Sequence, residues 1–369
     1  MEKDIVSVIV PVYNSEKYIE RCLSSVTGQT YNNLDILVII DGATDGSLDI
    51  CRSMACKDAR IRIIEKENEG LGKTRNLGIK SAFGEYITFL DSDDMLESEF
   101  VEKLMCSMQE NDSDMALCDI YYCDICTGEK VASKIRFDKA VKSFQSDRTV
   151  INKVRTFAWG KLYRKRLFDE KNMYPGHTFE DIPVTAVLAF KARAISYVGE
   201  PMYIYFRNME NSLSMNPDNI GDITKTLELL YNRFFDMEMT ESVNLEIKKL
   251  MIGQLRFAYV RWGKPGKKCG EKVQAELDNL NKLVEKYYPG IGGFADKMFY
   301  VEQKDLERAV SHVAVDGSQY TGSPEKADYV ISRSILDYYS NKNIVIPMSY
   351  GVDEDFDDWG AAEYIMENM

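Results

Sequence analysis

The stretch VSVIVPV at residues 6–12 is an almost unbroken run of β-branched residues, as expected for a strand buried on both faces of a sheet. A second run, DILVII at residues 35–40, has the same character and ends at Asp41-Gly42. Further elements alternate around these runs, with helices expected at 16–26, 48–54 and 71–82 and strands at 61–64 and 86–90. This rhythm predicts βαβ units and a mainly parallel sheet in a doubly wound α/β layer.

Length and composition limit the class of protein. At about 100–200 residues per domain, 369 residues suggest two domains or one domain with an appendage. A net charge of −13 argues against nucleic-acid binding through broad electrostatics. No apolar run approaches the roughly 20 residues of a transmembrane helix, no signal peptide is visible, and the eight cysteines form no regular framework. We therefore expect a cytoplasmic protein with free thiols.

The pattern changes near residue 216. Before it we expect a helix at 100–108, a strand at 115–123, a helix at 184–191 and short strands at 195–198 and 203–206. Beyond it, two apolar stripes recur at helical spacing, at Ile220, Ile223, Leu227, Leu230, Tyr231 and Phe234 and at Ile247, Leu250, Met251, Leu255, Ala258 and Trp262. The sequence thus predicts an α/β domain at 1–216 and a mostly helical region at 217–369, the latter with a strand-like run at 343–347 and an acidic run at 353–358.

Three aspartates follow the predicted strand at 86–90. In parallel α/β sheets, ligands bind beyond the carboxyl ends of the strands, so Asp91, Asp93 and Asp94 are placed at the binding edge. Carboxylates spaced in this way supply the oxygen ligands that Mg²⁺ and Mn²⁺ prefer, together with substrate phosphates. An Asx turn or a helix cap before the next helix is the structural alternative, although a cap needs only one such residue.

Two further acidic positions are candidates for chemistry. Asp41 ends its strand beside Gly42, where a carboxylate could accept a hydrogen bond from a nucleobase or a ribose hydroxyl. Glu180-Asp181 precedes a helix that starts near Pro183. That pair could cap the helix, or it could supply a general base.

Other constellations are less informative. Cys118, Cys123 and Cys126 have an iron–sulfur-like spacing but fall in and just after a predicted strand, and the two histidines, His177 and His312, show no zinc pattern. No G-x-S-x-G motif follows a strand, which argues against a triad hydrolase. The first strand is followed by PVYNSE, without the glycine-rich loop that a nicotinamide-dependent oxidoreductase or a sugar-nucleotide pyrophosphorylase would need there.

Taken in order, these motifs resemble the family 2 glycosyltransferases of GT-A fold. The resemblance covers about residues 4–215, with departures at Ile40, where relatives often carry a second acidic residue, and at Pro175-Gly176-His177. The matching segments are VSVIVPVYN at 6–14, Tyr18-Ile19, SSV at 24–26, QTY at 29–31, IDGATDGS at 40–47, NEG at 68–70, TRNLGI at 74–79, GEYITFLDSDD at 84–94, WGKLY at 159–163 and Glu180-Asp181.

The resemblance implies an inverting transferase that uses a nucleotide-diphosphosugar donor, usually UDP-linked, with Mn²⁺ or Mg²⁺, in the synthesis of a bacterial surface polysaccharide or glycolipid. Asp181 would be the catalytic base and Asp93 the metal ligand. The expected donor-binding residues are Pro11, Val12, Tyr13, Asp41, Arg75, Asn76, Asp91, Ser92 and Asp94, with Asp41 at the base and Asp91 at the ribose. On the acceptor side we expect Glu180 and Trp159, of which the tryptophan could equally be a core residue.

The acceptor would be a glycan or a lipid-linked sugar. A basic and aromatic stretch could lie on an anionic membrane surface as a peripheral contact, although a solvated face of a packing helix is the preferred explanation. Its residues are Lys248, Lys249, Arg256, Phe257, Tyr259, Arg261, Trp262, Lys264, Lys267 and Lys268. The alternative to an enzyme is a catalytically silent subunit that binds sugar nucleotides or carbohydrate.

Overall fold

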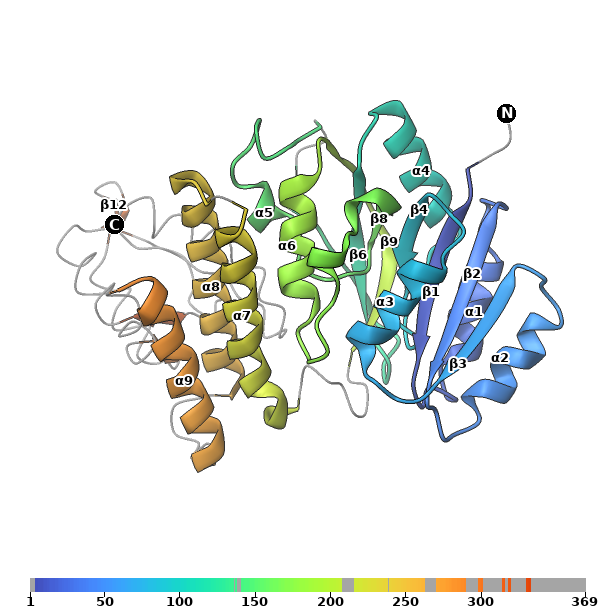
Figure 1. The fold of residues 1–369 in the computed structure, drawn as a ribbon, viewed down its shortest axis with the longest axis horizontal. Helices are drawn as coiled ribbons and strands as arrows, with labels where there is room; N and C mark the ends of the chain where they lie inside the picture. Colours follow the sequence, from blue (N-terminus) through green and yellow to red (C-terminus); the bar gives the residue numbers. More distant parts are fainter. Residues whose placement is uncertain are drawn as a thin grey trace. The chain divides into compact units, whose positions relative to one another are not determined.

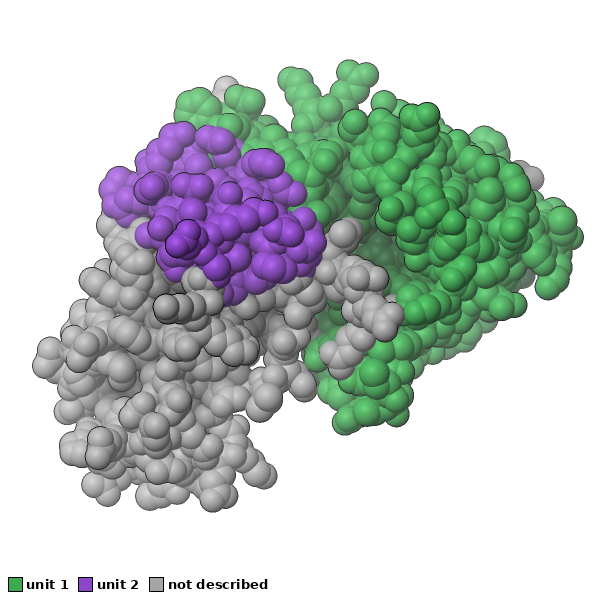
Figure 2. Space-filling model, turned by 90° about the horizontal axis from the view of Figure 1, so that it is seen from below, with its two compact units in different colours: residues 1–215, 229–243 green, residues 216–228, 244–369 purple. Residues whose placement is uncertain are grey.

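The computed structural model describes residues 4–135, 137, 141–207, 216–237, 239–262 and 270–289, together with short strands further on. The chain divides into two compact units, which have different colours in Figure 2. One unit contains residues 1–215 and 229–243, and the other contains 216–228 and 244–369. The predicted runs at 343–347 and 353–358 lie outside the described residues.

A single mixed sheet forms the centre of the first unit (Figure 1). Its strand order is β3-β2-β1-β4-β8-β6-β9-β5, and β7 pairs with β6 outside this path. The strands are β1 (Val6–Val12), β2 (Leu34–Asp41), β3 (Ile61–Lys66), β4 (Tyr86–Phe89), β5 (Met95–Leu96), β6 (Met115–Asp124), β7 (Lys130–Ser133), β8 (Lys161–Arg164) and β9 (Ile195–Arg207). The helices are α1 (Ile19–Thr27), α2 (Ser47–Ala55), α3 (Leu71–Ser81), α4 (Phe100–Glu110), α5 (Val150–Lys153) and α6 (Asp181–Lys191).

Alternating side chains along β1 pack against helices on opposite faces of the sheet, as the period of a strand requires. Val8 and Val10 belong to the core that includes the buried residues of α1, α2 and α4. Ile9 points to the other face, where a Cβ added at Gly78 of α3 would lie 2.4 Å from the Ile9 Cγ2 atom. Both faces of β1 are therefore covered, which explains why the strand is apolar except at Ser7, whose hydroxyl donates to Asp35.

The parallel order that the sequence predicts is confirmed for the first four strands. β1 pairs in parallel with β2 and β4, and β2 pairs in parallel with β3. Beyond β4 the sheet is mixed, because β8 runs antiparallel to both β4 and β6. The two short strands expected at 195–198 and 203–206 are one strand, β9, which follows β6 through a register shift near Asp119. Such an irregularity breaks the alternation from which strands are predicted.

Three helices are described at the start of the C-terminal region: α7 (Ile220–Phe235), α8 (Glu241–Trp262) and α9 (Glu271–Tyr287). The apolar stripe of α7 is buried as predicted, with Ile220, Leu227 and Phe234 fully inaccessible. Within the second unit, Lys272 forms an ion pair with Asp218 and Lys286 with Glu228. Short strand pairs follow, β10 (Met298–Tyr300) with β13 (Val330–Ser332) and β11 (Ala314–Val315) with β12 (Ser318–Gln319). No helix in the described part of the chain is long and apolar enough to cross a membrane.

The basic stretch around α8 is only partly described. Lys249 is buried and forms an ion pair with Glu246 at 3.0 Å, so it does not belong to an exposed basic face as expected. Lys264, Lys267 and Lys268, and the side chains of Arg256, Tyr259 and Arg261, lie outside the described residues. Peripheral membrane contact therefore remains a prediction.

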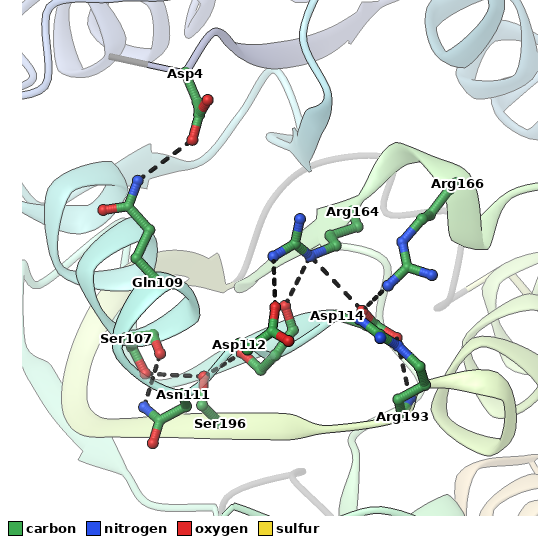
Figure 3. A network of polar contacts seen from close by, with 11 residues as sticks. Asp4, Ser107, Gln109, Asn111, Asp112, Asp114, Arg164, Arg166, Arg193 and Ser196 are labelled. Carbon is green, nitrogen blue, oxygen red and sulfur yellow. Dashed lines mark hydrogen bonds and ion pairs between the residues drawn. The ribbon is translucent and has the colours of Figure 1, made fainter. Parts of the chain in front are cut away.

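Asp114, a buried aspartate, joins three loops near the first residues of strands β6 and β9 (Figure 3). Asp114 accepts hydrogen bonds from the backbone N–H and the guanidinium of Arg193 and from Arg166. Burial opposes the charge of Asp114, but the hydrogen bonds from Arg193 and the nearby charge of Arg166 hold the pKa of its carboxyl below the ordinary value. The neighbouring Asp112 forms an ion pair with Arg164 and is 80% exposed.

We predict that Asp114→Asn lowers the free energy of unfolding by about 1.5–3 kcal/mol, because it weakens several hydrogen bonds to charged groups. The matched variant Asp112→Asn should cost at most about 1 kcal/mol, as for an exposed pair. Because the folded pKa of Asp114 lies below its unfolded value, its contribution is present above about pH 4 and is lost as the pH falls further. Urea unfolding at pH 7 and pH 3 measures both effects. An equal loss of unfolding free energy in the two variants would contradict the role of Asp114 in holding these loops together.

Candidate functional site

Hydrogen bonds between side chains hold together the loops that follow β1, β2 and β4. The Ser15 hydroxyl lies 2.6 Å from that of Ser92, and the Ser15 backbone N–H donates to the hydroxyl of Ser47 at the start of α2. Asn14, with a positive φ of 47°, accepts a bond from the backbone N–H of Thr44. The three polar clusters that the sequence places at strand ends therefore form one edge, as the rule for parallel sheets predicts. Serine pairs in separate loops gave no motif from which this link could be predicted.

Residues 11–13 take three different positions at the end of β1. Pro11 and Val12 are buried, and Val12 belongs to the core beneath α1. Tyr13 is 53% exposed. The side chain of Tyr13 is accordingly available to a ligand. The Val12 side chain is buried, so a donor contact at Val12 stays a prediction for its backbone alone.

Asp94 fixes the loop after β4 to the end of β9. Its carboxylate accepts a 2.7 Å hydrogen bond from the Tyr203 hydroxyl and a 2.9 Å bond from the backbone N–H of Phe206. The side chain is 1% exposed. We had expected Asp94 to contact a donor, but both of its oxygens face β9, so the structure gives it a role in holding the loop.

Asp93 lies in the same loop and is half-buried. Burial, and then the negative charge of Asp91, raises the pKa of Asp93 to about 6, while Arg21 opposes the rise. Arg21 of α1 donates to the backbone carbonyl of Asp93 at 2.7 Å and stacks over the ring of Phe206. No sequence motif marks Arg21, which holds this loop from the side of α1.

Asp41 organises the segment that leads into α3. Its Oδ1 accepts bonds from the Lys66 ammonium at 2.5 Å and from the backbone N–H of Glu69, and its Oδ2 accepts one from the N–H of Gly70. A carboxylate can accept about four hydrogen bonds, so Oδ2 retains capacity for one more donor. A nucleobase contact at Asp41 stays a prediction that this geometry permits.

Arg75 of α3 connects two acidic segments that are far apart in the sequence. Its Nη2 donates to the Asp91 carboxylate at 2.8 Å, and its Nη1 donates to the carboxylate of Glu180. The arginine side chain is 2% exposed, and Glu180 is buried as well. The sequence predicts that Arg75 supports the donor and that Glu180 faces an acceptor. The bond from Arg75 to Asp91, the predicted ribose ligand, is compatible with the first prediction, whereas the Glu180 carboxylate is buried against Arg75. Neither charge could be buried alone.

Two other residues of α3 hold the segment that precedes α6. The side-chain amide of Asn76 donates to the Tyr174 carbonyl at 2.8 Å and accepts from the Tyr174 N–H at 2.9 Å. At Gly72, an added Cβ would lie 2.0 Å from the carbonyl oxygen of Pro175. The Asn76 amide therefore binds the backbone of this segment, and its support of the donor region stays a prediction.

Asp181 is the first residue of α6 and is half-buried. Phe179, two residues earlier, has a positive φ of 60°, so a tight turn sets the start of the helix. Burial raises the pKa of Asp181 to about 7, with further increases from the negative charges of Glu180 and Asp91, while Arg75 and Lys161 oppose the rise. A carboxyl group with a pKa near neutrality is suited to general acid–base chemistry.

Trp159 is a core residue. It is 5% exposed and stacks on Phe157 and on Tyr203, each at a centroid distance of 4.4 Å. The buried ammonium of Lys161 donates to the carbonyl oxygens of Phe157 and Trp159, which fixes this aromatic segment. Of the two possibilities that the sequence left open for Trp159, the structure supports the core and not a sugar platform.

Comparisons with known proteins define the family. Residues 7–179 match the family described as Glycosyl transferase family 2. Glycosyltransferase GlyG of Streptococcus pneumoniae is 32% identical over 220 residues, which are 55% of this chain and 71% of GlyG. The putative glycosyltransferase EpsH of Bacillus subtilis is 36% identical over 213 residues, or 56% of this chain and 61% of EpsH, and GlyA of S. pneumoniae is 35% identical over 229 residues, or 57% of this chain and 32% of GlyA. The chain belongs to family 2 of the glycosyltransferases.

A solved structure supports the fold. The structure of S. aureus TarS 1–349 in complex with UDP-GlcNAc covers 89% of this chain and 99% of its own, with a TM-score of 0.66 and 20% sequence identity. At this level of identity the similarity concerns the fold alone. The GT-A fold with a helical C-terminal region, expected from the sequence, is confirmed. The chain spans less than two thirds of EpsH and about one third of GlyA.

We predict that Gly72→Ala displaces the segment around Pro175 and destabilises the protein by about 1–3 kcal/mol, the usual cost of overpacking. The control is Gly176→Ala in the facing segment, where an added Cβ would lie 3.4 Å from the flexible Lys73 side chain, an ordinary contact. Its effect should stay within about 0.5 kcal/mol. Thermal unfolding of both variants tests the contact, and a fully stable Gly72→Ala variant would show that α3 does not approach Pro175 closely.

Proposed function

We propose that this chain is an inverting glycosyltransferase that moves a sugar from a nucleotide-diphosphosugar, UDP-linked, to an acceptor hydroxyl. The observation that carries the proposal is the Arg75 contact, which brings the start of α6 with Asp181 beside the aspartate loop after β4. A base and a donor-binding edge on the same site are what a single displacement needs. The UDP-GlcNAc bound to the TarS neighbour supports a UDP-linked donor.

In this proposal, separate residues bind the donor and remove the proton. Asp41 accepts a hydrogen bond from the nucleobase, Tyr13 lines the pocket of the base, and Asp91 accepts a hydrogen bond from the ribose. Asp181 removes the proton of the acceptor hydroxyl while that oxygen forms a bond to the anomeric carbon. The bond from this carbon to the diphosphate breaks at the same time, and its electron pair leaves with the nucleoside diphosphate. Attack and departure on opposite sides invert the anomeric configuration, so no covalent intermediate forms.

The carboxylates at this edge fit a divalent cation that is coordinated jointly by the protein and by the phosphates of the sugar donor. In the described part of the chain, no three His, Cys, Asp or Glu side chains gather as a metal site. Mg²⁺ and Mn²⁺ are commonly bound by one or two carboxylates with substrate phosphates completing the coordination, so Asp93, with Asp91 beside it, would hold the ion only together with a donor. When bound, the cation stabilises negative charge on the departing diphosphate.

The acceptor follows from the family resemblance and not from the site. We propose a glycan or lipid-linked sugar in the synthesis of a bacterial surface polysaccharide or glycolipid. Because Trp159 and Glu180 are both committed to contacts inside the protein, acceptor recognition must use other groups near Asp181.

Thermal unfolding with UDP, with and without Mn²⁺, tests the donor site. A ligand at about 100 times its Kd adds roughly 2.7 kcal/mol to the free energy of unfolding, enough to raise the Tm by several degrees. We expect such a rise only with Mn²⁺ present, and its loss in Asp93→Ala. A shift with GDP, CDP or dTDP but not with UDP would show that the donor carries a different nucleotide. No shift with any nucleotide would favour the alternative of a catalytically silent subunit.

The pH dependence of turnover tests the base. Because the pKa of Asp181 is about 7 and the base must be ionised, the rate of UDP release from the active UDP-sugar should rise tenfold per unit below that value and level off above it. Asp181→Asn should lower the rate by about 10²–10⁴-fold and remove the rise. An unchanged profile in Asp181→Asn would assign the base to another residue.

A further inference from the structure

A chain of ion pairs runs from the loop after β4 to the start of α6 through a single guanidinium. Arg75 donates to Asp91 with one terminal nitrogen and to Glu180 with the other. The two carboxylates belong to residues separated by 89 positions, and the arginine between them is buried. A planar guanidinium fixes the direction of both bonds, which an ammonium would not.

Glu180 immediately precedes Asp181, so whatever fixes Glu180 also fixes the first turn of α6. The same segment is held at Tyr174 by Asn76 and lies against Gly72. All three contacts come from α3, whose own start is bound by Asp41. The position of Asp181 relative to the aspartate loop therefore depends on α3, and Arg75 is the residue of α3 that touches both sides.

We propose that Arg75 and Glu180 are positioning residues. The Asp91–Arg75–Glu180 chain sets the position of Asp181 relative to the loop after β4, and neither Arg75 nor Glu180 touches a substrate. This inference rests on the proposed function for the role of Asp181. Its structural content, that a change at Asp91 reaches the start of α6, does not depend on any nucleotide.

Hydrogen–deuterium exchange of the full chain without ligand tests this content. We expect Asp91→Asn to accelerate exchange in peptides that cover residues 172–184 by about tenfold or more, because the buried guanidinium of Arg75 then loses one of its two charged partners. Asp35→Asn is the matched control, because Asp35, like Asp91, pairs with an arginine, in this case Arg62, elsewhere in the sheet. In Asp35→Asn, exchange in residues 172–184 should be that of the wild type.

Variants at Glu180 separate positioning from ligand contact. Glu180→Gln keeps an oxygen that can accept from Arg75, so its exchange in 172–184 should lie between wild type and Glu180→Ala. If Glu180 does not touch the donor, the Kd for UDP with Mn²⁺ should change less than twofold in Glu180→Ala. The rate of UDP release from the active UDP-sugar should nevertheless fall at least tenfold, with the loss in kcat and an unchanged KM.

Three results would overturn the proposal. Exchange in Asp91→Asn could increase only near its own loop, or Asp35→Asn could accelerate residues 172–184 equally, or Glu180→Ala could weaken UDP binding tenfold. Failure of the proposed function looks different: UDP would not bind to the wild type at all, whereas the exchange results would still confirm or refute the ion-pair chain.

Discussion

The buried guanidinium of Arg75 is the contact on which the arrangement of the site depends. It separates Asp91 from Glu180, and its charge also opposes the rise in the pKa of Asp181. Three acidic side chains gathered at reduced solvent access would otherwise repel one another and favour their neutral forms. Removing one partner from such a group leaves uncompensated buried charge, which is far more costly than losing an exposed pair.

The helix that carries Arg75 acts on both ends of the site because small residues let it lie close to its neighbours. Gly78 allows contact with Ile9 of β1, and Gly72 allows contact with the segment before α6. Gly70, with a φ of 89°, turns the chain so that its N–H reaches Asp41. The motif at 68–79 is thus explained by packing: α3 links the end of β2, the loop after β4 and the start of α6.

The sequence predicted which residues lie together more accurately than which contacts each of them makes. Buried strands and the strand-end rule located Asp41 and Asp91–Asp94 at one edge, because these depend on local pattern and on a general property of parallel sheets. The roles of Asp94, Asn76 and Glu180 depend instead on partners about 100 residues away, at Tyr203, Tyr174 and Arg75. No periodicity records such pairings, and an acidic or amide side chain looks the same whether it binds a ligand or the protein itself.

The charge of the site also limits how a donor could bind. A nucleoside diphosphate would bring negative charge to an edge where Asp91 and Asp93 already lie close enough for Asp91 to raise the pKa of Asp93. Two described cations at this edge already have partners: Arg75 donates to two carboxylates, and Arg21 donates to a backbone carbonyl. A divalent counterion shared with the phosphates, or protonation of Asp93, would reduce this repulsion in the proposed binding mode. These alternatives predict opposite pH trends, because a cation binds better as Asp93 ionises, whereas binding that needs a neutral Asp93 weakens above about pH 6.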